Sequence, residues 1–534
     1  MTTITIYRAA NVITLDGADT EAFATANGRV LATGLLAELR AQLPAAEVVD
    51  LGAATVIPGF NDAHAHPGMC AVGSVYVGLN PADTPTADAV RTALAERAAR
   101  TPAGEWVVGH DFDAKRTEGG QGIDRAFLDA VSSDHPILLI HKSYHSASAN
   151  SPALAAAGYG EQSPDPVGGE LVRDGAGNLT GLLHERAWFE GFMGFGGRTR
   201  LIPLDDLDGR VQALSTMLAG MNAAGITSVC DALTHPPEWR LFTAARERGA
   251  LTARIGMLVW YDHIDTLAGL GLHAGFGDEW LRLTGVKMMF DGALTTGTCF
   301  CSEPYAGPDG PTTGLQVLTD AELDDTVDRV HSSGNRLAIH TNGDAGIDRV
   351  LRAIEAAQAR DPRPTRHRIE HCSLVDDAII ARLAAAGVAA VPFGAMIGYL
   401  GDRLIDLYGE DRARRACAHG SLLAAGVPVG GSSDYTVGPY EPLLAMRSMV
   451  TRRTPGGVVL GPEQRLTARQ ALGVYTTGSA AASGEEQVKG KLAPGYLADF
   501  AVLAENPLEA DPETLPDIPV LSTWIGGEQV WSAS

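Results

Sequence analysis

The sequence predicts an α/β fold in which a (β/α)8 TIM-type barrel is joined to β-rich additions. Strand-like apolar runs alternate with helix-like stretches through the middle of the chain. Both ends of the chain carry short strand-like runs separated by turn residues instead. The length of 534 residues is sufficient for a barrel with additions. We therefore expect a barrel, a β-domain shared by both termini and an insertion.

The terminal segments are expected to form one composite β-sandwich domain from residues 1–55 and 485–534. In the first segment, Asp16-Gly17 and Asn27-Gly28 separate short apolar runs, which is typical of a small antiparallel unit. The second segment carries a matching set at 500–503, 520–525 and 529–531.

Residues 56–72 and 201–484 are expected to form the barrel, with the first strand beginning at the end of the preceding segment. The eight candidate strands are 55–61, 226–231, 253–260, 285–290, 336–340, 368–371, 388–393 and 427–433. Helical patterns lie between them, for example at 206–224, 320–333, 345–359 and 412–425.

Residues 73–200 interrupt the barrel after its first strand and are too many for a βα loop. This insertion contains a strand-like run at 136–141 and a Gly/Asp-rich stretch at 168–178 that is expected to form a hairpin. Because the insertion begins directly after a barrel strand, we expect it to form a lid over the barrel mouth.

Composition excludes several partners. The formal net charge of −23 argues against nucleic acid and anionic membranes, and no apolar stretch approaches the roughly 20 residues of a membrane span. The first residues lack a signal peptide pattern. The six cysteines show no paired framework, and Cys299-x-Cys301 lacks the second pair of a zinc knuckle. We expect a soluble, cytoplasmic protein that acts on a small molecule.

In the stretch 56–67 an apolar, β-prone run ends in Pro58-Gly59, and two histidines then follow at alternate positions. In an extended backbone His64 and His66 point to the same side, as ligands of one metal ion must. An H-x-H pair also occurs among ordinary core and surface histidines. A metal-binding role for these two therefore depends on further ligands elsewhere in the chain.

Further polar residues fall at the carboxyl ends of predicted barrel strands, where barrel enzymes place their chemistry. Lys287 lies on the fourth strand, His340 ends the fifth, His371 ends the sixth, and Asp434 follows the eighth. Histidines with a carboxylate suit Zn²⁺ or a similar divalent ion with an open position. Such an ion lowers the pKa of bound water to about 7, and an aspartate beside that water can take its proton.

Lys287 has two interpretations. Its amine, when desolvated, can react with CO₂ to give a carbamate whose two oxygens bridge two metal ions. Alternatively, the ammonium group forms a buried salt bridge with Asp291 or Asp434.

Together the motifs resemble the amidohydrolase superfamily and, within it, the YtcJ-like amidohydrolase family 3, the group that includes N-substituted formamide deformylase. The resemblance covers nearly the whole chain. Its motifs lie at 58–66, 225–229, 286–287 with 291–292, 340–344, 366–371, 431–434 and 495–499.

The resemblance implies a metal-dependent hydrolase with one or two divalent ions, most simply Zn²⁺. Lys287, in N6-carboxylated form, would bridge them, and Asp434 would bind metal and act as general base and then acid. A homodimer is common in the group. The implied histidine ligands are His64 and His66 for the first ion and His340 and His371 for the second.

The insertion also resembles the group at 109–113, at His145 with Asn150-Ser151, and at 180–185. The chain departs from the group's pattern at 111–112, at Tyr144 and at 293–301, where substrate is expected. The candidate substrate-binding residues are Asp113, Tyr144, His145, Asp231 and Cys299.

Several of these candidates have structural alternatives. His145 is a candidate catalytic oxyanion donor or substrate contact, or else a hydrogen-bonded lid histidine. Asp231 contacts substrate or caps the following helix. We expect structural roles for His110, His141, Glu185 and Trp188.

Three functions remain open from the sequence. The first is hydrolysis of an amide or N-acyl C–N bond in a small, partly hydrophobic molecule. The second keeps the barrel and metal but catalyses ester or lactone hydrolysis, deamination or a lyase step. The third is a non-catalytic metal-binding or scaffold protein, which has no need for a base such as Asp434.

Overall fold

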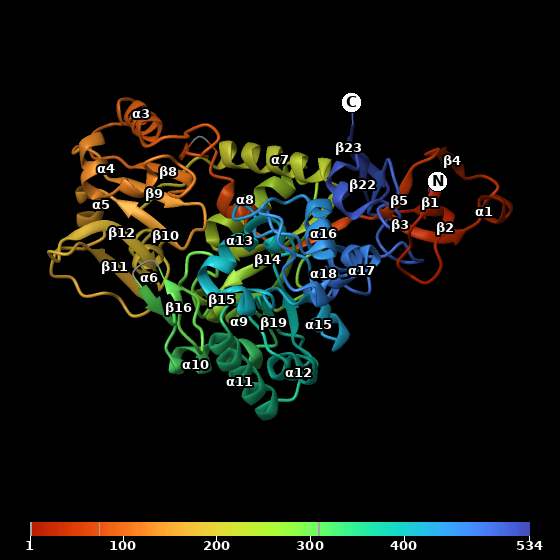
Figure 1. The fold of residues 1–534 in the computed structure, drawn as a ribbon. Helices are drawn as coiled ribbons and strands as arrows, with labels where there is room; N and C mark the ends of the chain where they lie inside the picture. The colour runs from red at the N-terminus through yellow and green to blue at the C-terminus, as the bar shows by residue number, and fades with distance from the viewer. Residues whose placement is uncertain (1–2, 74, 308–309, 534) are drawn as a thin grey trace.

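The barrel of this protein is formed by seven parallel strands in a computed structural model that describes residues 3–73, 75–307 and 310–533 (Figure 1). Each strand pairs in parallel with its neighbour in the order β6-β13-β14-β15-β18-β19-β20. The strands are β6 Phe60–Ala65, β13 Ile226–Thr234, β14 Arg254–Trp260, β15 Leu281–Met289, β18 Leu337–Thr341, β19 Arg368–His371 and β20 Ala389–Val391. The α/β barrel expected from the sequence is confirmed.

The predicted eighth strand, 427–433, closes the barrel through scattered contacts rather than as a regular strand. Parallel bridges join Val429 to Ala390 and Ser432 to Phe393 on one side. On the other side, the Ala63 amide donates to the Gly431 carbonyl at 2.8 Å. A Cβ at Gly431 would lie 2.5 Å from the Tyr475 ring, so the segment packs directly against its neighbours at this glycine.

The first predicted barrel strand, 55–61, is divided between two sheets, which corrects the sequence prediction. β5, Thr55–Pro58, pairs with strands of the terminal sheet, and β6 begins only at Phe60. The Gly59 amide donates to Asp499 of the terminal part at 2.9 Å, and the next amide, from Phe60, donates to Gly225 of the barrel at 3.0 Å. A Cβ at Gly59 would lie 2.2 Å from Thr227 Oγ1, so this crossing requires glycine.

Strands from both ends of the chain share one eight-stranded sheet. Its path runs β23-β22-β21-β5-β1-β2-β3, with β4 paired to β1. β4 and β5 lie parallel to β1, so the unit is mixed rather than purely antiparallel as expected. Its division into two facing layers stays a prediction. The further strands are β1 Ile4–Val12, β2 Thr20–Ala26, β3 Arg29–Gly34, β4 Glu47–Asp50, β21 Phe500–Leu503, β22 Val520–Ile525 and β23 Glu528–Ser532.

The insertion builds its own six-stranded sheet, which lies at the opposite side of the barrel from the terminal sheet (Figure 1). The expected strand at 136–141 is β9, and the expected hairpin is the antiparallel pair β11–β12. Trp188 and Phe192 of the insertion pack in one apolar cluster with Trp260 and Met289 of the barrel. The strands are β7 Val77–Gly78, β8 Val107–Phe112, β9 Ile137–His141, β10 Ser146–Ala149, β11 Gly169–Arg173 and β12 Leu179–Glu185.

Helices surround the barrel and begin at capping residues. Asp376 caps α12, and Thr319 with Glu322 forms a capping box at α10. The single helix expected at 412–425 is instead two short helices, α14 and α15, because the chain turns at Cys417 with φ +50°. Among the described residues, none of the helices has the length and apolar character needed to cross a membrane.

The barrel helices of six or more residues are α7 Leu207–Ala223, α8 Pro236–Glu247, α9 Ile264–Gly269, α10 Asp320–Ser332, α11 Asp344–Arg360, α12 Asp377–Ala386, α13 Met396–Tyr408, α15 His419–Ala424, α16 Pro442–Thr451 and α17 Ala468–Gly473. The shorter α2 Pro67–Cys70, α14 Glu410–Ala413 and α18 Ser479–Ser483 join them, and α1 Leu36–Gln42 packs on the terminal sheet. The insertion contributes α3 Ala87–Ala98, α4 Arg125–Val131, α5 Ser151–Ala156 and α6 Arg186–Trp188.

Candidate metal centre

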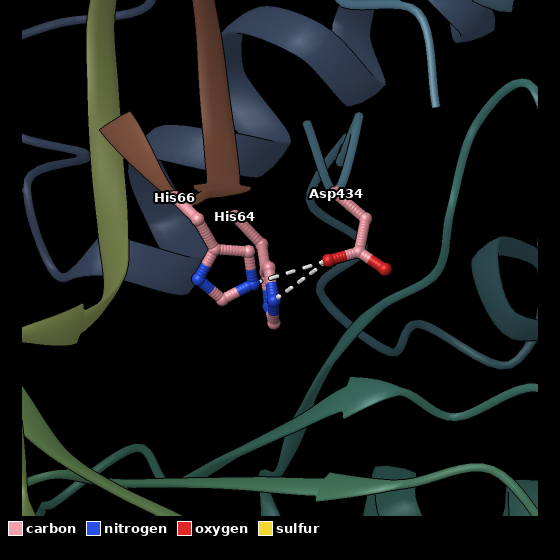
Figure 2. A group of neighbouring side chains, drawn as sticks. All are labelled: His64, His66 and Asp434. Atoms are coloured by element: carbon pink, nitrogen blue, oxygen red, sulfur yellow. Dashed lines mark ion pairs between the residues drawn. The ribbon is translucent and has the colours of Figure 1, made fainter. Parts of the chain in front are cut away.

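Three side chains converge at the carboxyl end of β6. His64 Nε2 and His66 Nε2 lie 3.4 and 3.2 Å from Asp434 Oδ1 (Figure 2). One ligand atom from each residue lies within 4.8 Å of the others. Alternation along an extended strand brings the two imidazoles to one side, and the segment after the eighth barrel position adds the carboxylate. This donor set suits a divalent ion such as Zn²⁺.

A buried carboxylate that the sequence analysis missed sets the orientation of His64. Glu370 on β19 contacts His64 Nδ1 and also pairs with Arg368, and the exposed fraction of both Glu370 and Arg368 is 0%. Burial disfavours the charged form, but Arg368 and His64 outweigh it and lower the pKa of Glu370. Nδ1 of His64 is therefore occupied by Glu370, and Nε2 of His64 is the nitrogen that faces Asp434.

Asp434 is held in an unusual backbone conformation, with φ +51°. Its amide donates to the His64 carbonyl at 2.9 Å. Asp62 steadies the same turn by accepting hydrogen bonds from the amides of Ser433 and His64. Burial opposes ionisation, yet the neighbouring imidazoles, first that of His371, lower the pKa of Asp434 well below its ordinary value. The carboxylate is thus available as a ligand or a base.

The other two predicted histidine ligands lie beside this cluster but outside it. The His371 ring centroid is 4.8 Å from that of His64 and 4.6 Å from that of His340. His340 Nε2 lies 3.2 Å from the Gly292 carbonyl, and among the described residues no hydrogen bond engages its Nδ1. Burial lowers the pKa of His66 to about 4 and that of His371 to about 3. Neutral imidazoles are the form that binds metal.

Lys287 lines the same cavity and is 3% exposed. Burial lowers the pKa of its amine to about 8. In the part of the chain that the structure describes, Lys287 forms no ion pair with Asp291 or Asp434, so the salt bridge that was its alternative interpretation is absent there. Asp291 instead accepts hydrogen bonds from the amides of Phe300, Asn342 and Gly343 at 2.8–3.0 Å.

The cavity above these residues is lined on one side by the insertion, and most of its lining surface is apolar. Ser143, Tyr144, His145 and Phe189 of the insertion line it together with barrel residues. Its apolar barrel lining consists of Met69, Leu233, Trp260, Met289 and Val437. The cavity therefore brings apolar walls next to the polar cluster.

His145 and Tyr144 are the two predicted substrate-binding residues that line this cavity. His145 Nδ1 lies 2.9 Å from both carboxylate oxygens of Glu185. The Tyr144 carbonyl accepts a hydrogen bond from Trp188 Nε1 at 2.6 Å, which gives Trp188 the structural role that was expected.

The other three predicted substrate-binding residues are not among the residues that line the cavity. Asp113 accepts amide hydrogen bonds within its own turn and lies 4.0 Å from His141 Nε2. Asp231 neither lines the cavity nor caps the following helix, because it accepts from the Gly68 amide at 2.9 Å and from Thr234 Oγ1 at 2.6 Å. Cys299 is buried with its Sγ 3.1 Å from the Tyr408 hydroxyl.

Comparison with known proteins places this site in a family. The profile of the amidohydrolase family matches residues 47–531, and the chain belongs to this family. The resemblance drawn from the motifs is thereby confirmed, and the protein is a metal-dependent hydrolase.

Two relatives match over almost the full length. The chain is 30% identical over 540 residues to N-substituted formamide deformylase of Arthrobacter pascens, covering 97% of this chain and 96% of that protein. It is 29% identical over 532 residues to YtcJ of Bacillus subtilis, covering 97% of each. Among solved structures, an uncharacterized metal-dependent hydrolase from Pyrococcus horikoshii OT3 superposes with a TM-score of 0.75 at 25% identity, covering 96% of this chain and 99% of that one.

Proposed function

We propose that the protein hydrolyses a C–N bond, an amide or N-acyl group, in a small and partly hydrophobic organic molecule. The observation that carries the proposal is the His64–His66–Asp434 cluster at the base of an apolar cavity. A full-length relative named as an N-substituted formamide deformylase supports an amide as the bond that is cleaved.

The ligands proposed for the metal are the residues that line one side of the cavity. His64, His66 and Asp434 would hold one divalent ion, most simply Zn²⁺, while His340 and His371 would hold a second. Lys287 would join the two as an N6-carboxylated bridge. Its amine is buried and has no ion-pair partner among the described residues, which supports this role. Bound there, a divalent ion supplies a nucleophilic water at neutral pH and polarises a carbonyl group.

The protein's own residues would handle the proton and orient the substrate. The ionised Asp434 accepts a proton from the attacking water and passes it to the leaving nitrogen. His145 contacts the acyl group from the lid side of the cavity. Phe189, Trp260 and Met289 cover the apolar part of the substrate and exclude bulk water.

The proposal also covers the location of the enzyme, the role of the insertion and the assembly. The six cysteines are all free in the described structure, which supports a reducing, cytoplasmic location. The insertion acts as a lid, and a homodimer is the assembly we expect.

The proposal is tested with zinc-loaded protein on matched pairs of formamides, acetamides and the corresponding esters. We expect amide hydrolysis in the wild type. Asp434→Asn should retain fold and lose turnover by about 100- to 10,000-fold, whereas His64→Ala should also lose metal. Hydrolysis of the esters alone, or full activity of Asp434→Asn, would contradict the proposal.

A further inference from the structure

We propose that Glu185 is a positioning residue that fixes the ring of His145, so that the lid presents His145 Nε2 to the acyl group of the substrate. The inference rests on the proposed function. From the sequence, Glu185 was expected to have only a structural role.

The contact between the two residues is close and buried. Both carboxylate oxygens of Glu185 lie 2.9 Å from His145 Nδ1, and Glu185 is 0% exposed. The Glu185 amide also donates to the His145 carbonyl at 3.0 Å. Side chain and main chain therefore hold the same pair, and the imidazole has little freedom to rotate.

Glu185 has no lysine or arginine partner among the described residues. A buried carboxylate is unfavourable unless it is paired and hydrogen-bonded. Within the described ranges, the Glu185 carboxylate has the His145 ring as its hydrogen-bond partner and Thr298 Oγ1 as a more distant donor at 3.4 Å. A residue needed merely to pack the lid would not have to be charged.

The backbone around the pair is also unusual. Glu185 has φ +48° and ψ −125°, and Tyr144, next to His145, has φ +57°. Residues other than glycine rarely adopt positive φ, and such strain tends to occur where a side chain must be aimed. One strained residue is thus Glu185 itself, and the other directly precedes its partner His145.

His145 is the member of the pair that reaches the site. Its side chain is 14% exposed and lines the cavity, and its ring centroid lies 5.0 Å from that of His340. With Nδ1 directed at Glu185, Nε2 is the nitrogen left without a hydrogen-bond partner in the described structure. Glu185 itself does not line the cavity, so it acts through His145.

Thr298 extends this arrangement to the barrel. Its hydroxyl accepts from the Ala293 amide at 2.9 Å and donates toward Glu185. The segment after β15, where the chain departs from the pattern of its group, is thus linked to the lid through one carboxylate.

The test compares Glu185→Gln, His145→Ala and the double variant in the zinc-loaded enzyme. We expect Glu185→Gln to lower kcat by about 10- to 100-fold, with KM within about two-fold and with unchanged metal content and Tm. In the His145→Ala background the same change should have no further effect, because the two residues act as a unit. Glu190→Gln is the control: Glu190 lies in the same lid segment but pairs with Arg186, and its variant should keep wild-type kcat.

Independent effects of the two substitutions, or wild-type kcat in Glu185→Gln, would overturn the inference. If Glu185→Gln does not fold, Thr298→Val replaces it: we expect a few-fold loss of kcat that disappears in the His145→Ala background, and an equal loss in both backgrounds would overturn the inference.

A binding measurement separates this inference from the proposed function. Formate, the smallest acyl product, is titrated into each variant by calorimetry. We expect Glu185→Gln and His145→Ala to weaken formate binding by the same factor. Equal formate binding by the wild type and Glu185→Gln would overturn the inference, whereas a wild type that binds formate but cleaves no amide would contradict the proposed function alone.

Discussion

Replacing Glu370 by glutamine tests how the metal ligand His64 is oriented. Glutamine has nearly the same shape but no charge, and its single carbonyl oxygen cannot serve both His64 Nδ1 and Arg368. Arg368 donates from one guanidinium nitrogen to Glu370 at 2.9 Å and to the Ala63 carbonyl at 2.7 Å, and it is fully buried. The substitution therefore leaves a buried guanidinium without a counter-charge.

Two magnitudes follow from this geometry. Breaking a buried ion pair on one side costs about 3–5 kcal/mol of stability. Loss of the partner that orients a metal-binding histidine lowers metal affinity by about 10- to 100-fold. We expect both effects in Glu370→Gln.

The assay measures the free energy of unfolding of the metal-free protein in urea and the zinc dissociation constant against a competing chelator. Glu355→Gln is the matched control, because Glu355 forms a two-pronged pair with Arg382 near the surface. That pair is worth about 0–1 kcal/mol, and its loss should leave zinc affinity unchanged. A Glu370→Gln variant with the zinc affinity of the wild type would refute the assigned role.

Three further predictions follow. Dialysis against a chelator should abolish hydrolysis, and zinc should restore it; activity that survives metal removal would contradict the account. Asp499→Asn breaks the pair with Arg254, at 2.6 and 2.8 Å, that joins the terminal sheet to β14, and should cost about 3–5 kcal/mol in urea unfolding without changing metal content. Burial lowers the pKa of His419 to about 3, so the unfolded chain takes up this proton first as pH falls below about 6.5. His419 should therefore contribute about 2 kcal/mol to the stability that is lost between pH 7 and pH 5. In urea titrations at the two pH values, His419→Asn should lose less stability than the wild type by about 2 kcal/mol.

The parts of the site that could be predicted from sequence are those fixed by local geometry. His64 and His66 lie on one side of a strand because side chains alternate along it with a period of two residues. The carboxyl ends of all strands of a barrel meet at one face, where residues of different strands come together. This reasoning placed Lys287, His340, His371 and Asp434 around one cavity. It could also have found Glu370, since Arg368 and Glu370 alternate on β19 in the same way.

The remaining features depend on contacts between distant segments. The crossing at Gly59 is set by Thr227 and by backbone partners far along the chain. The contact between His145 and Glu185 requires β10 and β12 to be neighbours in the sheet, and no local sequence pattern predicts this pairing. Cys299 and Asp113 were predicted to bind substrate because they adjoin atypical segments. Neither lines the cavity, and their role in substrate binding stays a prediction.

The metal content of the wild type and of His64→Ala, measured per chain by mass spectrometry of the metals after gel filtration, tests the central claim most directly. We predict one or two zinc equivalents in an active wild type and a marked loss of both metal and hydrolysis in His64→Ala. A wild type that hydrolyses amides with no bound metal, or a His64→Ala variant that keeps its full metal content and activity, would contradict the assignment of this site.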